Sequence, residues 1–180
     1  MTEDEQIKLL LDFSNPISEA ISLLNDGGKD GKIYSNQAIM LLLIFFDQLG
    51  WLSSPKDFSD GGDFKKWLNT YMEFSGLNCS AEDLWVARCG LLHMGLPYNK
   101  QFNDNKNYQI AWYSDLFFTE DQRKLEESKY AKPTKLVNTN SLIINFQKAL
   151  FKFFKDVLNN KELNAVVMSK LKKRPIHYQF

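Results

Sequence analysis

The stretch Ala38-Ile39-Met40-Leu41-Leu42-Leu43-Ile44-Phe45-Phe46 is the longest apolar run in this chain of 180 residues. A helix that is hydrophobic on every side has no face for solvent, so other elements must surround it. We therefore expect a helix that starts near Ser35 and ends before Gly50 to be the centre of the fold. The run has nine residues, whereas a helix needs about 20 to cross a bilayer, so we expect a soluble protein that does not enter a membrane.

Amphipathic helices are predicted on both sides of this central segment. Apolar residues recur at helical spacing over residues 7–24, 64–72, 84–92 and 142–157, and a shorter helix is expected over 162–171. The expected helix starts are a capping-box pattern at Thr2-x-x-Glu5, a cap at Asp63, a capping-box pattern at Ser80-x-x-Asp83, and a cap at Asn140 or Ser141. Mostly short connections between helices favour an all-α, antiparallel helical bundle.

Residues 96–135 interrupt the helical pattern. They contain an Asn-rich turn, a stretch over 108–118 that is either a strand or irregular, and a short charged helix over 120–130 that Thr119 caps. We therefore expect an irregular or partly β insertion between the fourth helix and the last long helix. Because no linker or repeat is visible, residues 1–180 are predicted to form a single domain with this insertion.

The composition limits the chemistry. With two Cys and two His and no CxxC or HExxH pattern, a dedicated zinc site is not expected, and no glycine-rich phosphate loop is present. We therefore expect neither a metal nor a cofactor. The acidic start of the chain is unlike an export signal. The rise of the predicted helix would separate Cys79 and Cys89 by about 15 Å, which is too far for a disulfide. A cytoplasmic protein with free thiols is the prediction.

Charge is unevenly distributed along a chain whose net charge is zero. Residues 1–63 have a net charge of −7 and residues 64–180 have +7. Lys148, Lys152 and Lys155 line one side of the last long helix. They either contact an extended polyanion or simply solvate a helix face.

One predicted helix contains both Arg88 and His93, in an R-x-x-x-x-H arrangement. The residues three and four positions from Arg88 are all apolar, so no carboxylate of the same helix pairs with it. Burying an unpaired guanidinium costs several kcal/mol, and a partner from elsewhere is therefore expected. Asp47, a carboxylate within the apolar central helix, also needs a partner. Either the two neutralise each other as a structural pair, or Asp47 orients the arginine or histidine of an RNA site.

The stretch Asp83-Leu84-Trp85-Val86-Ala87-Arg88-Cys89-Gly90-Leu91-Leu92-His93, with Phe46-Asp47-Gln48-Leu49-Gly50, resembles the HEPN domains. These are helical bundles of prokaryotic conflict systems and RNA-processing proteins, and many are metal-independent ribonucleases. The resemblance implies an R-x(4–6)-H site at the interface of a homodimer, with Arg88 and His93 as its catalytic residues. Cys89 stands where many members carry Asn, Asp or His. The implied partners are RNA and a cognate antitoxin or effector-complex protein.

Three functions remain open at this point. In the first, the chain is a HEPN-like endoribonuclease, a toxin or antiviral effector. There the ribose 2′-hydroxyl is the nucleophile, His93 transfers protons and Arg88 binds the phosphate. The three lysines of the last long helix, Lys148, Lys152 and Lys155, contact the RNA backbone. In the second, a non-catalytic module dimerises or binds a nucleotide or protein, and Arg88 pairs structurally with Asp47. In the third, the chain is a plain bundle in which His93 ends a helix.

Overall fold

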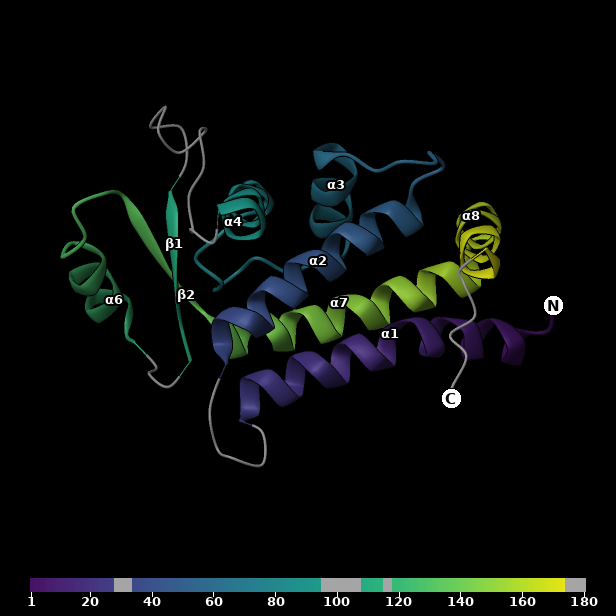
Figure 1. Ribbon diagram of the computed structural model, residues 1–180, viewed down its shortest axis with the longest axis horizontal. Helices are drawn as coiled ribbons and strands as arrows, with labels where there is room; N and C mark the ends of the chain where they lie inside the picture. The colour runs from purple at the N-terminus through teal and green to yellow at the C-terminus, as the bar shows by residue number, and fades with distance from the viewer. Residues whose placement is uncertain (28–33, 95–107, 115–117, 174–180) are drawn as a thin grey trace.

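The computed structural model describes residues 1–27, 34–94, 108–114 and 118–173. Its helices are α1 (Glu3–Asp26), α2 (Ser35–Ser53), α3 (Gly61–Tyr71), α4 (Ala81–Met94), α6 (Glu120–Glu127), α7 (Thr139–Asn159) and α8 (Lys161–Lys172). Its strands are β1 (Gln109–Tyr113) and β2 (Thr134–Asn138). The prediction of a mainly α-helical protein is confirmed, and a small sheet is added to it (Figure 1).

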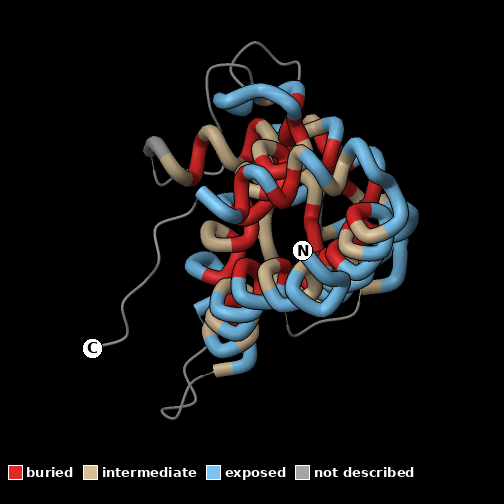
Figure 2. The backbone as a smooth tube through the Cα atoms, turned by 90° about the vertical axis from the view of Figure 1, so that its right-hand side faces the viewer, coloured by how far each residue is buried: buried red, intermediate tan, exposed pale blue. Residues whose placement is uncertain are grey.

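Three long helices, α1, α2 and α7, form the core, and Figure 2 shows their buried residues gathered on the inside. The ring of Phe45 on α2 lies 5.4 Å from that of Phe13 on α1 and 5.5 Å from that of Phe146 on α7. The predicted central position of the apolar helix is therefore confirmed. Although α2 is so apolar, no helix in the described ranges is long and apolar enough to cross a membrane.

Helix α1 runs antiparallel to both α2 and α7, whereas α3, α4 and α8 cross these long helices (Figure 1). At the end of α1, Asn25 donates a hydrogen bond to the side chain of Asn140, near the start of α7, at 2.7 Å. Gly50 allows α3 to approach α2, because a Cβ there would lie 3.0 Å from backbone atoms of Asp63 and Phe64. The antiparallel arrangement predicted for the whole bundle is thus seen for α1 against α2 and α7.

The predicted insertion forms a β–α–β unit. Strands β1 and β2 pair in parallel, with Gln109 opposite Thr134 and Tyr113 opposite Asn138, and α6 lies in the connection between them. The expectation of a partly β insertion is confirmed, although β2 continues past the predicted boundary at residue 135. Residues 95–107 and 115–117 of the insertion lie outside the described part of the chain. Because β2 leads directly into α7, the sheet is attached to a core helix.

Two helices start earlier than the sequence pattern predicted. The side chain of Asp60 caps α3 by accepting the N–H of Asp63, which itself lies in the first turn. Asn138, rather than Asn140 or Ser141, caps α7 and accepts the N–H of Ser141. In both places an earlier polar residue has the extended backbone that a cap requires.

Candidate functional site

Arg88 of α4 and Asp47 of α2 form an ion pair that joins the two helices. Nε of the guanidinium donates a hydrogen bond to Oδ2 of the carboxylate at 2.6 Å, and Nη2 lies 2.5 Å from the same oxygen as an ion pair. Each side chain is 22% exposed, so the pair lies at the surface with one side against the core. The prediction that Arg88 takes its partner from another helix is therefore confirmed, and that partner is Asp47.

Trp85 also contacts the guanidinium. Cζ of Arg88 lies 5.3 Å from the centroid of the Trp85 ring, within the range of a cation–π contact. The indole packs in turn on the ring of Phe64, at 5.3 Å. It lies so close to Gly61 that a Cβ there would come within 2.7 Å of it. Asp47 and Trp85 together hold the arginine side chain in one position.

Burial alters the protonation of the acidic groups around Arg88. It raises the pKa of the Asp47 carboxyl above its ordinary value, and the hydrogen bond and positive charge of Arg88 act against that increase. Burial also raises the pKa of the neighbouring Cys89 thiol, again with Arg88 acting in the opposite direction. For Asp47 the loss of hydration outweighs the attraction of the guanidinium. The Asp47 carboxyl is therefore more readily protonated than an exposed one, even beside Arg88.

His93 lies in the last turn of α4, but its side chain is outside the described part of the structure. It stands five positions after Arg88, which is about 140° around the helix axis. Cys89 precedes it by four positions and so lies on the same side of α4. The structure brings Arg88, Asp47 and Cys89 together, and the place of the imidazole beside them stays a prediction.

The lysines predicted to follow an RNA backbone are exposed on the outer side of α7: Lys148, Lys152 and Lys155. The ring of Phe146, which packs on two phenylalanine rings of α2, marks the side of α7 that faces α2. Lys148 and Lys155 lie about 200° and 180° around the helix from Phe146, so they point away from α2. Asp47 points from α2 toward α4. The structure therefore does not bring these lysines to the Arg88–Asp47 pair.

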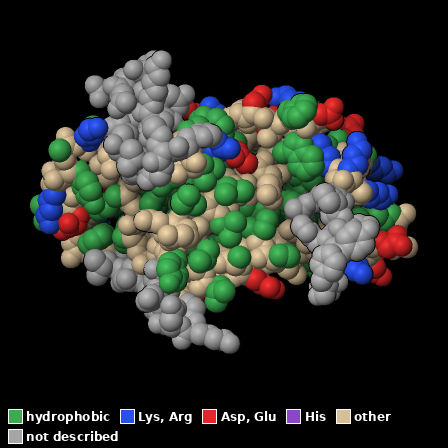
Figure 3. All heavy atoms as spheres, viewed as in Figure 1, with side chains coloured by type: hydrophobic (Ala, Val, Ile, Leu, Met, Phe, Trp, Pro, Cys, Tyr) green, Lys and Arg blue, Asp and Glu red, His purple; other side chains and the backbone are tan. Residues whose placement is uncertain are grey.

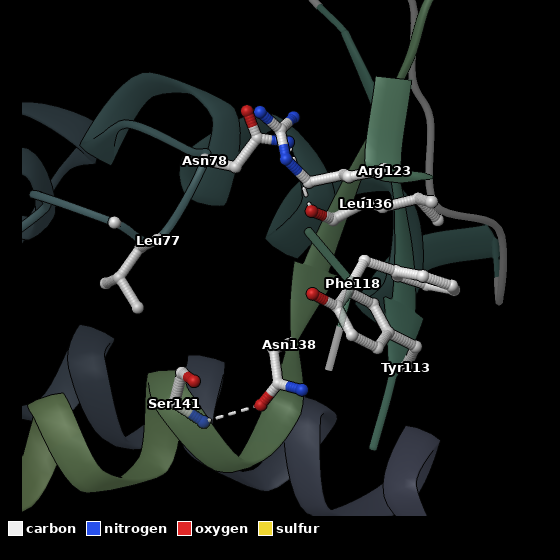
Figure 4. Close-up of a pocket in the computed structure, with 9 residues that line it drawn as sticks. Leu77, Asn78, Tyr113, Phe118, Arg123, Leu136, Asn138 and Ser141 are labelled. Atoms are coloured by element: carbon white, nitrogen blue, oxygen red, sulfur yellow. Dashed lines mark hydrogen bonds between the residues drawn. The ribbon is translucent and has the colours of Figure 1, made fainter. Parts of the chain in front are cut away.

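A cavity of about 210 Å³, which the sequence did not predict, lies beside the small sheet (Figure 4). It is bordered by residues 76–78, Tyr113, Phe118, Arg123, Leu136, Asn138 and Ser141. These come from the connection after α3, from both strands, from α6 and from the start of α7. Because segments so far apart in the chain form it, no local pattern in the sequence could have indicated it.

Both cysteines, Cys79 and Cys89, are free, as predicted. Among the residues whose side chains are described, no three His, Cys, Asp or Glu side chains are grouped so that they could bind a metal ion. No family model, curated protein or solved structure matches this chain.

Proposed function

We propose that this chain is a metal-independent endoribonuclease of HEPN type, which cuts RNA with Arg88 and His93 at the interface of two copies. The observation that carries the proposal is the state of Arg88, which Asp47 and Trp85 hold in place while the side chain stays 22% exposed. A planar guanidinium with several donors is suited to bind a phosphate. As the resemblance implies, such an enzyme would act as a toxin or antiviral effector under the control of a partner protein.

The chemistry needs no metal because RNA carries its own nucleophile. The ribose O2′ attacks the adjacent phosphorus and the bond from phosphorus to O5′ breaks, which leaves a 2′,3′-cyclic phosphate and a 5′-hydroxyl. His93 takes the proton from the 2′-hydroxyl, and His93 of the partner subunit gives a proton to O5′. Arg88 stabilises the negative charge on the phosphorane oxygens.

Asp47 acts in this scheme as a positioning residue. A structural ion pair would be expected to stabilise the fold, yet burial raises the pKa of Asp47 despite the hydrogen bond from Arg88. Its hydrogen bond and ion pair hold the guanidinium of α4 against α2, where Trp85 also contacts it. This supports a role for the pair in holding the guanidinium for a ligand.

Partly exposed apolar side chains on the Asp47 side of α2 support the dimer. Met40 and Ile44 lie seven and three positions before Asp47, and these spacings place them on the side of α2 that carries the Arg88–Asp47 pair. Figure 3 shows hydrophobic side chains gathered in the middle of the face over α2, with charged side chains toward its ends. A two-fold axis through this surface would bring two copies of Arg88 together.

A second candidate is a non-catalytic module that dimerises or binds a nucleotide or a protein. The observation in its favour is that Oδ2 of Asp47 engages two donors of Arg88 at once, as a structural pair would. Cys89 also offers a weaker hydrogen-bond donor than the Asn, Asp or His of many HEPN domains.

The two candidates separate when the purified protein is incubated with mixed RNA in the presence of EDTA. The ribonuclease is expected to release fragments that end in 2′,3′-cyclic phosphate, and Arg88→Ala and His93→Ala should release none. His177→Ala replaces the other histidine and serves as the matched control that cuts like the wild type. A wild-type protein that dimerises but leaves RNA intact would instead support the non-catalytic module.

A further inference from the structure

The cavity beside the sheet shares no residue with the Arg88–Asp47 pair. Two hydroxyl groups face its interior, those of Tyr113 at the end of β1 and Ser141 in the first turn of α7 (Figure 4). Within the described residues, neither hydroxyl has a hydrogen-bond partner. A hydroxyl can both donate and accept, so together they offer a ligand two adaptable polar contacts.

An aromatic pair forms one wall of the cavity. The rings of Tyr113 and Phe118 lie 5.0 Å apart at an angle of 52°, and both residues border the cavity. Aromatic side chains of this kind are the usual platform for the flat face of a base. A planar ring with polar edges would meet an aromatic wall and the two hydroxyls at the same time.

The cavity carries no net charge that would favour an anion. Arg123 is the one charged residue in its described lining. Nη1 of its guanidinium donates to both carboxylate oxygens of Glu127, at 3.0 and 3.1 Å. Asn78 donates to the same carboxylate at 2.7 Å, and Figure 4 shows Asn78 beside Arg123, across the cavity from Ser141. A neutral ligand therefore fits this lining better than a phosphate or a carboxylate.

The size of the cavity sets the size of its occupant. The volume is about 210 Å³. Pockets for drug-sized ligands have volumes of about 300–1,000 Å³. A single planar heterocycle is of a size that suits this cavity.

We propose that this cavity binds a single nucleobase, with the Tyr113–Phe118 wall against the base and the hydroxyls of Tyr113 and Ser141 at its polar edge. The sugar of the nucleoside stays at the mouth. This site is separate from the proposed RNA-cleaving site and does not depend on it, because Arg88 and His93 take no part in it.

The test uses the full chain labelled with ¹⁵N and titrated separately with adenosine, guanosine, cytidine and uridine, while backbone amide shifts are followed by NMR. Ribose 5-phosphate is the control for binding through the sugar and phosphate. At least one nucleoside is expected to bind saturably with Kd below about 1 mM, with shifts at residues 76–78 and at Ser141. Absence of saturable binding by all four nucleosides, or equal binding of ribose 5-phosphate, would overturn the proposal.

Conservative variants locate the site. Tyr113→Phe and Ser141→Ala each remove one hydroxyl and keep the packing, and each should weaken nucleoside binding roughly two- to ten-fold. Tyr130→Phe removes the hydroxyl of a tyrosine that does not border the cavity and should leave binding unchanged. Nucleoside binding that neither Tyr113→Phe nor Ser141→Ala weakens would place the ligand elsewhere and contradict the assignment.

Discussion

A single carboxylate oxygen, Oδ2 of Asp47, accepts a hydrogen bond from Nε of Arg88 and forms an ion pair with Nη2, which holds a guanidinium of α4 against α2. The pair remains partly exposed, and burial raises the pKa of the Asp47 carboxyl. The contribution of the pair to the free energy of unfolding and its role in positioning Arg88 can therefore be measured separately.

Asp47→Asn should change the free energy of unfolding by less than about 1 kcal/mol, because dehydration of the carboxylate offsets its attraction to Arg88. RNA cleavage should nevertheless fall, since the guanidinium loses its charged anchor. Urea unfolding curves measure the first quantity. The matched control is Glu120→Gln, which breaks the exposed pair with Lys124 and should not measurably alter stability. A loss of about 3–5 kcal/mol in Asp47→Asn would identify the pair as structural.

The pH dependence of stability follows from the same carboxyl. The folded-state pKa of Asp47 is raised. The contribution of this carboxyl to the free energy of unfolding is therefore fully present below its unfolded-state pKa and is lost as the pH rises through its folded-state pKa. The wild type should therefore lose stability relative to Asp47→Asn as the pH rises from about 3 to about 6. Urea unfolding of both proteins across this range measures the difference. A wild type that gained stability relative to the variant would show that Arg88 lowers the pKa of Asp47.

The two thiols should react at very different rates. Burial, assisted by the charge of Asp83, raises the pKa of Cys79 to about 12, whereas Cys89 is partly exposed. Since the thiolate is the reacting form, one thiol of the native protein should react with a disulfide reagent at pH 8 and the other only on unfolding. Cys89→Ser should remove the fast phase and Cys79→Ser should keep it. Equal rates for the two thiols would contradict the burial of Cys79.

The proposed dimer can be tested on α2. Ile44 is 37% exposed and lies beside the Arg88–Asp47 pair, while Ile144 is 52% exposed on α7. Ile44→Glu should weaken the dimer by about tenfold or more, because it places an unpaired carboxylate in the interface. Ile144→Glu is the control and should not affect association. Sedimentation velocity over a range of concentrations measures this, and a wild type that remains monomeric throughout would rule out the dimer.

Local patterns in the sequence were enough to predict the central helix and the need of Arg88 for a partner outside its own helix. The run from Ala38 to Phe46 has no polar face, so its burial does not depend on what packs around it. Arg88 has only apolar neighbours on its own helix, and the cost of an unpaired charge predicts a partner such as Asp47.

Features that depend on distant contacts could not be predicted in this way. The parallel pairing of β1 and β2 joins two five-residue strands, which are too short for a clear alternating pattern. Lys170 stands among basic residues and has the pattern of a solvated lysine, yet it is buried and donates to three backbone carbonyls at and after the end of α2. Its burial follows from where α8 lies against α2, which the local sequence does not encode.

The single-turnover rate of RNA cleavage by Arg88→Ala, compared with that of the wild type, tests the central claim most directly. Both proteins are assayed in EDTA, and their free energies of unfolding are measured so that a loss of rate is not a loss of folded protein. Removing a group that stabilises charge on the reacting phosphate should lower the rate by about 100-fold or more. Equal rates for the two proteins, or RNA left intact by a folded, dimeric wild type, would contradict the account.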